Sequence, residues 1–164
     1  MSRVFGVGAA REAWRVGGAT WRRGRVVLVV DDFPALLGWA ARAFERGGWT
    51  VLIASDEAEA HLRRQEAIER GAPVALLVTG LEMPSFDGAA LAHELRALDA
   101  ALAVVAITGH TDEQTAWGGA TLERSALFQK PVHAEALLDA AESLLPHPPE
   151  PRTGDPRAEA VRPR

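Results

Sequence analysis

The sequence lacks cysteine altogether, which excludes disulfide bonds and any cysteine-based metal or redox site. It also lacks an apolar run near the roughly 18 residues of a membrane-spanning helix, and its N-terminus lacks the apolar stretch of a secretory signal. With 164 residues, 48% of them hydrophobic, the chain can build one ordinary globular core. We therefore expect a cytoplasmic protein with one domain and no contact with membranes.

Lysine is scarce as well, since 17 of the 18 basic residues are Arg and Lys130 is the only Lys. Charge is unevenly spread along the chain. Residues 1–25 hold six Arg and one Glu, whereas residues 26–145 hold eight basic and eighteen acidic residues. The formal net charge of −4 therefore hides a basic leader and an acidic core. A lone lysine in such a chain is a candidate for a specific role.

The two ends of the chain lack the pattern of a folded segment. Residues 1–25 combine glycine pairs with no sustained apolar period, which predicts a flexible arm. Its interleaved Arg and Trp residues could bind nucleic acid or another anionic surface. Residues 146–164 contain six of the ten prolines, so we expect a flexible tail that is too short and too poor in apolar residues to form a DNA-binding domain. The globular domain is predicted to span residues 26–145.

Apolar segments alternate with helical segments five times within this domain. The continuous apolar run at residues 26–30 is typical of a strand that is buried on both faces of a parallel sheet. Pro34 suits the first turn of the helix that follows, and the Gly47–Gly48 pair ends that helix. Further strands are predicted at 49–54, 74–79, 102–108 and 126–129, and further helices at 56–70, 88–98, 112–117 and 133–145. This alternation predicts a doubly wound α/β fold with helices on both faces of the sheet.

Polar residues gather at the carboxyl ends of the predicted strands, where open parallel sheets bind their ligands. Asp31 and Asp32 follow the first strand. Thr108 ends the fourth strand, and Lys130 follows the fifth. The third strand ends at Gly80, which has no side chain. These five positions form the candidate site.

Four short motifs lie at these strand ends in a fixed order. They are Val-Asp-Asp-x-Pro at 30–34, Leu-Glu-Met-Pro at 81–84 with Asp-Gly at 87–88, Ile-Thr-Gly at 107–109, and Gln-Lys-Pro at 129–131. Together they resemble the CheY-like receiver domains of response regulators, over residues 26–145. The resemblance implies a flavodoxin-like fold with five parallel strands in the order 2-1-3-4-5. It also implies a protein of two-component phosphorelay signalling that is not an enzyme.

The family pattern gives each site position a role. In receiver domains the acidic pair helps to hold Mg²⁺, and an aspartate at the end of the third strand accepts a phosphoryl group. The threonine hydroxyl contacts that group, and the lysine neutralises it. By this resemblance Asp31, Asp32, Thr108 and Lys130 are present, but Gly80 stands at the acceptor position. Glycine offers no carboxylate, so no acyl phosphate can form there. The resemblance therefore implies a degenerate receiver with a vestigial phosphorylation pocket.

The missing carboxylate also affects metal binding. Two carboxylates and a carbonyl make a poorer oxygen cage than three carboxylates and a carbonyl, so we expect Asp31 and Asp32 to bind Mg²⁺ weakly or not at all. No other cofactor is expected. Clustered carboxylates repel each other unless they are paired, which predicts an ion pair between Lys130 and Asp31 or Asp32. Thr108 stays ambiguous, because a threonine at a strand end can also simply bond to the backbone.

Loop and switch positions complete the family pattern. Receivers commonly carry an aromatic residue three positions before the lysine, and Leu127 stands there, with Phe128 next to it. The usual aromatic switch is therefore predicted to be missing. Asp87 is predicted to cap the helix that begins near Gly88. The loop and switch positions are Glu82, Met83, Pro84, Leu127, Phe128 and Pro131.

Three functions compete. The first is a pseudo-receiver that acts through phosphorylation-independent protein interaction, with a histidine kinase or another signalling protein as partner or as a homodimer. Its expected contact face combines the fourth helix, the fifth strand and the last helix. The second is a phosphorylatable regulator with a non-standard acceptor such as Glu82. The third is a nucleic-acid or surface-binding protein that uses the Arg-rich arm, and we expect nucleic acid to be the less favoured partner.

Overall fold

The computed structural model describes residues 25–81, 83–109, 117 and 123–146. The predicted arm and tail lie outside this part except for one residue each, as does most of the predicted helix at 112–117. The boundaries of the arm and the tail therefore stay predictions. None of the helices in the described part is both long and apolar enough to cross a membrane.

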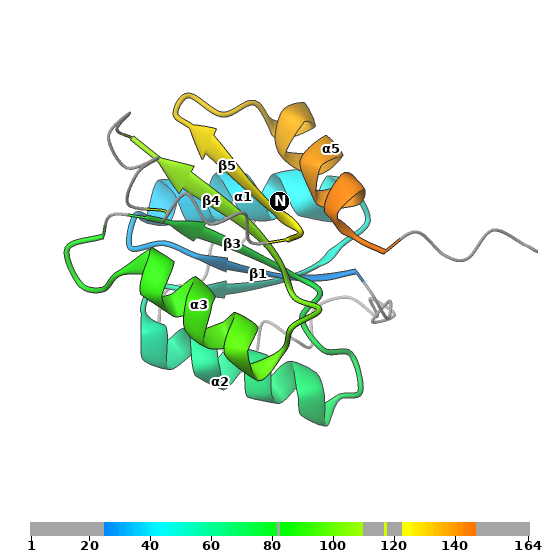
Figure 1. Ribbon diagram of the computed structural model, residues 1–164. Coiled ribbons are helices and arrows are strands. Elements are labelled where there is room, and N and C mark those ends of the chain that lie inside the picture. The colour runs from blue at the N-terminus through cyan, green and yellow to red at the C-terminus, as the bar shows by residue number, and fades with distance from the viewer. Residues whose placement is uncertain (1–24, 82, 110–116, 118–122, 147–164) are drawn as a thin grey trace, which may run out of the picture.

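A five-stranded parallel sheet forms the centre of the domain (Figure 1). The strands lie in the order β2-β1-β3-β4-β5, which confirms the predicted flavodoxin-like topology. β1 lies between β2 and β3, and its Val27 lies opposite both Val51 and Leu76. The strands are β1 (Val26–Val30), β2 (Thr50–Ala54), β3 (Leu76–Gly80), β4 (Ala103–Thr108) and β5 (Ser125–Gln129).

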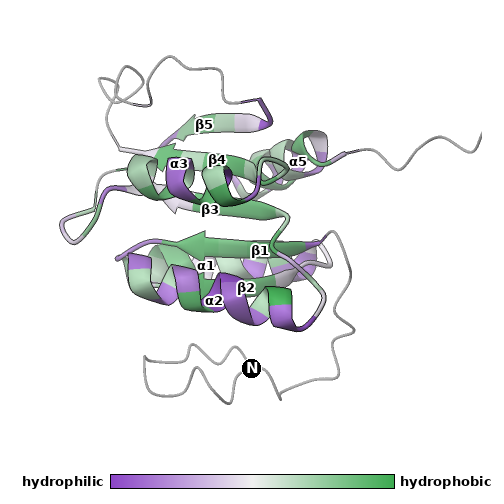
Figure 2. Ribbon diagram, turned by 60° about the horizontal axis from the view of Figure 1, so that its bottom comes forward, coloured by the Kyte–Doolittle hydropathy of each residue, from purple (hydrophilic) through white to green (hydrophobic). Residues whose placement is uncertain are grey.

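Helices cover both faces of the sheet, as the alternation of segments predicts. α1 and α5 pack on one face, and α2 and α3 pack on the other (Figures 1 and 2). Figure 2 shows largely apolar strands and helices that carry both hydrophilic and hydrophobic residues. The described helices are α1 (Pro34–Arg46), α2 (Glu57–Glu69), α3 (Gly88–Leu98) and α5 (Ala134–Leu144).

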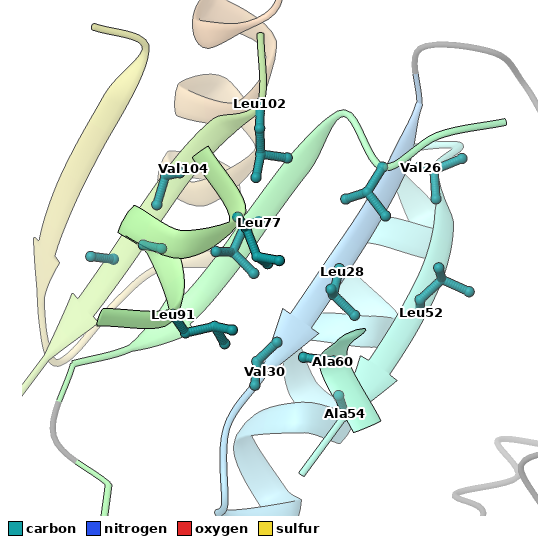
Figure 3. Packing of buried hydrophobic residues seen from close by; sticks show 14 of the residues in the cluster. Val26, Leu28, Val30, Leu52, Ala54, Ala60, Leu77, Leu91, Leu102 and Val104 are labelled. Carbon is teal, nitrogen blue, oxygen red and sulfur yellow. The ribbon is translucent and has the colours of Figure 1, made fainter. Parts of the chain in front are cut away.

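The sheet separates the core into two clusters, and the buried strand β1 contributes residues to both. All five of its residues are buried, and they alternate between the two faces of the sheet. Val26, Leu28 and Val30 face α2 and α3, where they join Leu77 and Leu91 (Figure 3). The remaining two residues of β1 face α1 and α5. A side chain of this kind contributes about 1.5–3 kcal/mol when it is fully buried, so the central strands are firmly held and their ends are well positioned.

The start of α3 is fixed against the end of β3. Asp87 caps the helix, since its Oδ1 accepts hydrogen bonds from the backbone N–H groups of Ala89 and Ala90 at 2.8 and 3.2 Å. This confirms the predicted cap. A Cβ on Gly88 would overlap the carbonyl oxygen of Gly80, so the close approach of the two segments requires glycine at position 88.

Candidate functional site at the carboxyl edge of the sheet

The ends of β1, β3 and β4 bring predicted site residues side by side. Val30 lies opposite Thr79 in the register of β1 and β3, and Asp31 and Gly80 are the next residues in each chain segment. Gly80 lies opposite Ile107 of β4. The acidic end of β1 therefore lies beside the position without a side chain.

Asp31 fills the space next to Gly80. The residue is buried, with 4% of its surface exposed. Its Oδ1 accepts a hydrogen bond from the backbone N–H of Phe33 at 2.8 Å. Its Oδ2 lies 2.5 Å from the point where a Cβ on residue 80 would stand, and the sulfur of Met83 lies 3.6 Å from that point. A side chain at position 80 would therefore meet the Asp31 carboxylate and would contact the sulfur of Met83.

The electrostatic environment of Asp31 disfavours its charge. Burial raises the pKa of this carboxyl above its ordinary value of 3.8. The hydrogen bond from Phe33 and the positive charge of Lys130 lower the pKa, whereas the charge of Asp32 raises it. Burial outweighs the two favourable contacts, so the carboxylate is incompletely compensated.

Lys130 follows β5 and is exposed. Its backbone N–H donates to the carbonyl oxygen of Thr108 at 2.8 Å, and its peptide bond to Pro131 is cis. Within the described residues, no salt bridge joins Lys130 to Asp31 or Asp32, so the predicted ion pair is wrong. The physical reason is local, because Asp31 turns one oxygen to the Phe33 amide and the other toward Gly80. Lys130 acts on Asp31 through its charge alone.

Two threonines lie buried near this edge. Thr108, the predicted site residue at the end of β4, is 1% exposed. Thr79 is also buried, and its hydroxyl donates a hydrogen bond to the carbonyl oxygen of Gly80 at 2.9 Å. This contact was not predicted from the sequence. The hydroxyl of Thr79 is thus engaged in holding the β3 end.

The loop after β3 contributes one wall and one exposed residue. Met83 is buried beside Gly80, whereas Pro84 is exposed. Glu82, the predicted alternative acceptor, lies outside the described residues.

The two predicted switch positions on β5 face opposite sides of the sheet. Leu127 packs against the cluster under α2 and α3, which includes Trp117. Phe128 packs against the cluster under α1 and α5. Adjacent strand residues alternate in direction, so Phe128 cannot stand in for an aromatic side chain at position 127.

Sequence analysis did not single out one residue beside the site and one group on the helical surface. Phe33, directly after the acidic pair, is 59% exposed. On the α2–α3 surface, Nε2 of His61 lies 3.2 Å from Oε1 of Glu94, and Glu57 lies close enough for the three ligand atoms to fall within 4.8 Å of one another. The i, i+4 spacing of Glu57 and His61 was the available signal, but nothing in the sequence joined it to α3.

The topology and the strand-end residues define a receiver-type α/β domain, with an acidic pair, a buried threonine and a lysine at one edge. A model of the response regulator receiver domain matches residues 27–142, and the chain belongs to this family. Receiver domains are parts of two-component response regulators, and they typically interact with histidine kinases and other signalling proteins. The family is thus a signalling family.

Known proteins give the same result. The chain is 29% identical over 119 residues to the transcriptional regulatory protein AruR of Pseudomonas aeruginosa, an alignment that covers 73% of this chain and 48% of AruR. It therefore spans about half the length of AruR. It is 27% identical to the response regulator receiver protein CpdR of Brucella abortus, with 73% of this chain and 95% of CpdR covered. Among solved structures, a response regulator receiver domain protein from Clostridium thermocellum superposes with a TM-score of 0.61 at 27% identity, covering 73% of this chain and 92% of that chain.

Proposed function

We propose that this chain is a degenerate receiver domain that acts in two-component signalling by phosphorylation-independent protein interaction. The observation that supports it is the geometry at position 80. Gly80 supplies no carboxylate, and Oδ2 of Asp31 lies 2.5 Å from the point where a side chain would begin. The acceptor side chain is thus missing, and a neighbouring carboxylate fills its place.

None of the described neighbours is a good substitute for the acceptor. Phosphoryl transfer to a carboxylate requires an accessible, ionised oxygen in line with the leaving group. Asp31 is buried, one of its oxygens binds the Phe33 amide, and burial raises its pKa. The hydroxyl of Thr79 is occupied by the Gly80 carbonyl. Glu82 stays an alternative acceptor that only experiment can test.

The donor set fits a tight Mg²⁺ site poorly. Mg²⁺ requires a near-octahedral shell of oxygens. Asp31 and Asp32 supply two carboxylates, and Asp31 has one oxygen on the Phe33 amide and the other directed toward Gly80. A carboxyl with a raised pKa is also a weaker ligand, because the metal must displace its proton. We therefore propose that Mg²⁺ binding is weak or lost.

We propose that this domain acts through a protein partner. The proposed partner is a histidine kinase or another cytoplasmic signalling protein, with a homodimer as the second option. The proposed contact face includes β5, which is the edge strand of the sheet next to β4, and α5. Residues Ser125–Phe128 of this strand are half-buried, so an edge is accessible to a partner. The predicted helix at 112–117, which sequence analysis assigns to this contact face, lies outside the described residues except for Trp117.

Intact mass measurement tests the absence of phosphorylation. The chain is incubated with a small phosphodonor and Mg²⁺, and a receiver domain with an intact acceptor aspartate is treated in parallel to show that the donor is active. We expect an adduct on the control alone. A single stoichiometric adduct on this chain that hydroxylamine removes would contradict the proposal, and loss of that adduct in a Glu82→Gln variant would assign it to Glu82.

A further inference from the structure

Arg25 ties the start of β1 to α5. Its guanidinium donates to both carboxylate oxygens of Glu142, at 2.6 and 3.0 Å, and lies 5.7 Å from the ring centroid of Trp49. Its backbone carbonyl accepts a hydrogen bond from the N–H of Thr50 at 2.9 Å. A bidentate pair of this kind fixes geometry as well as adding energy. The residue that directly precedes β1 is therefore held against α5.

Glu142 belongs to an acidic stripe on α5, formed by Glu135, Asp139 and Glu142. The spacing of i, i+4 and i+7 puts the three side chains on one face of the helix, and all three residues are exposed. Residues 134–144 contain no Lys or Arg. In the described part of the chain, Arg25 is the one cation that forms a salt bridge with the stripe, at its C-terminal member. Like charges four residues apart repel, so the stripe favours a cationic partner.

The segment that leads into Arg25 has the charge and the length to cover the stripe. Residues 1–24 carry five Arg and one Glu, and Arg22 and Arg23 are separated from Arg25 by Gly24 alone. Three extended residues reach about 10 Å, and the seven helical steps from Glu135 to Glu142 also rise about 10 Å. An arm that is held at one end of the stripe can therefore reach the other end.

We propose that residues 20–24 dock on the acidic stripe as a continuation of the Arg25–Glu142 contact. Attachment at Arg25 gives the arm a high effective concentration at the stripe, which favours it over a free cationic partner. Exposed ion pairs are individually weak and screened by salt, so the docking is reversible and salt-sensitive. This inference does not depend on Gly80.

The absence of cysteine allows a direct test in the full chain. A Thr20→Cys substitution introduces a single thiol for a nitroxide label, whose unpaired electron broadens the NMR signals of nearby amides. At low salt we expect loss of the amide signals of residues 135–143 relative to the chemically reduced label, with recovery at high salt. Loss confined to other elements, or loss on α5 that high salt does not reverse, would overturn the proposal.

Charge-matched variants sharpen the test. Glu135→Gln combined with Asp139→Asn should restore the α5 signals, whereas Glu57→Gln combined with Glu69→Gln, the same charge change on α2, should leave the loss in place. Should the α5 variant fold poorly, the double variant Arg22→Gln and Arg23→Gln removes the positive charges of the arm instead. It should restore the amide signals of α5 in the same way.

Two results would contradict docking of the arm on its own domain. The first is equal signal loss in all three variants. The second is loss that arises mainly between molecules, when labelled chains are mixed with isotopically enriched, unlabelled chains, because the stripe would then bind a second copy.

Discussion

Arg63 on α2 and Asp31 at the end of β1 are both buried charges, with 7% and 4% exposed, yet they are compensated very differently. Arg63 donates to Glu59 at 3.0 Å, to Glu66 at 3.1 Å and to the carbonyl oxygen of Ile53 at 3.3 Å. Asp31 accepts one backbone hydrogen bond. The positive charge of Lys130 lowers its pKa, but the two residues form no salt bridge. A charge buried for stability is normally paired. The buried carboxyl of Asp31 at the end of β1 thus lacks the ion pairs that compensate the buried charge of Arg63.

Removal of Arg63 should have the largest effect. Arg63→Ala leaves Glu59 and Glu66 without their cation and the Ile53 carbonyl without a donor. The two carboxylates are partly exposed and can regain water, so we expect a loss of about 3 kcal/mol, the lower end for a broken buried pair. Urea denaturation measures it. The control is Arg64→Ala, for which about 0.5 kcal/mol is expected. Similar losses for the two variants would mean that the Arg63 network adds little.

Filling the space at Gly80 comes next. Gly80→Ala places a Cβ 2.5 Å from Oδ2 of Asp31, which must then move within a buried site. We expect a loss of about 2 kcal/mol, typical of overpacking. Gly109→Ala is the matched control, since a Cβ there meets nothing within 4 Å.

A double-mutant cycle shows whether Asp31 causes the loss. In an Asp31→Ala background the cost of Gly80→Ala should fall by about 1 kcal/mol or more, because contacting residues couple in this range. Additive effects of the two substitutions would show that Asp31 does not occupy the space.

Much of the fold follows from local patterns in the sequence. The apolar run at 26–30 predicts a strand buried on both faces, and all five residues are buried. Asp87 is predicted as a helix cap, and its carboxylate accepts two backbone hydrogen bonds. Strand order follows from the four motifs at the strand ends, because each motif marks a position in the receiver family. These features depend on short-range chemistry or on a family pattern.

The arrangement of charges could not be predicted in the same way. The strand-end pattern brings Asp31 and Lys130 to one edge, but it does not specify that the Phe33 amide, two residues away, binds the Asp31 oxygen instead. Arg63 looks like an exposed helix residue with Glu neighbours at i−4 and i+3, yet packing beside β2 buries it. Side-chain direction and burial depend on tertiary packing, which spacing along one segment does not contain.

Neutralising Asp31 should give a smaller effect of opposite sign. Its raised pKa means that the folded protein keeps this proton over a pH range in which the unfolded chain has released it. Stability from this group is therefore present at low pH and lost as the pH rises from 3.8 through the folded-state pKa. Asp31→Asn should raise the stability by about 1 kcal/mol at neutral pH, a usual size for one substitution.

The pH dependence of this gain in stability shows whether it comes from removal of the carboxylate charge or from another effect of the substitution. Urea denaturation across a pH series should show that the gain shrinks toward acidic pH, where Asp31 is protonated in both states. Lys130 and Asp32 both act on the group, the first to oppose the gain and the second to add to it. Asp32→Asn, at a half-exposed position, is the control and should change stability less. A gain that persists unchanged in acid would show that the carboxylate charge is not the cause.

The exposed Arg25–Glu142 pair should give the smallest effect and extends the comparison to a charge that is paired but not buried. Its side chains are 36% and 47% exposed, so water and salt screen the attraction. Glu142→Gln should therefore cost about 0.5 kcal/mol at low salt, and high salt should abolish the difference. Glu123→Gln, an exposed acidic position with the same charge change, should have no comparable salt-dependent effect. A loss near that of Arg63→Ala would mean that bidentate geometry and the Trp49 contact matter more than burial in this domain.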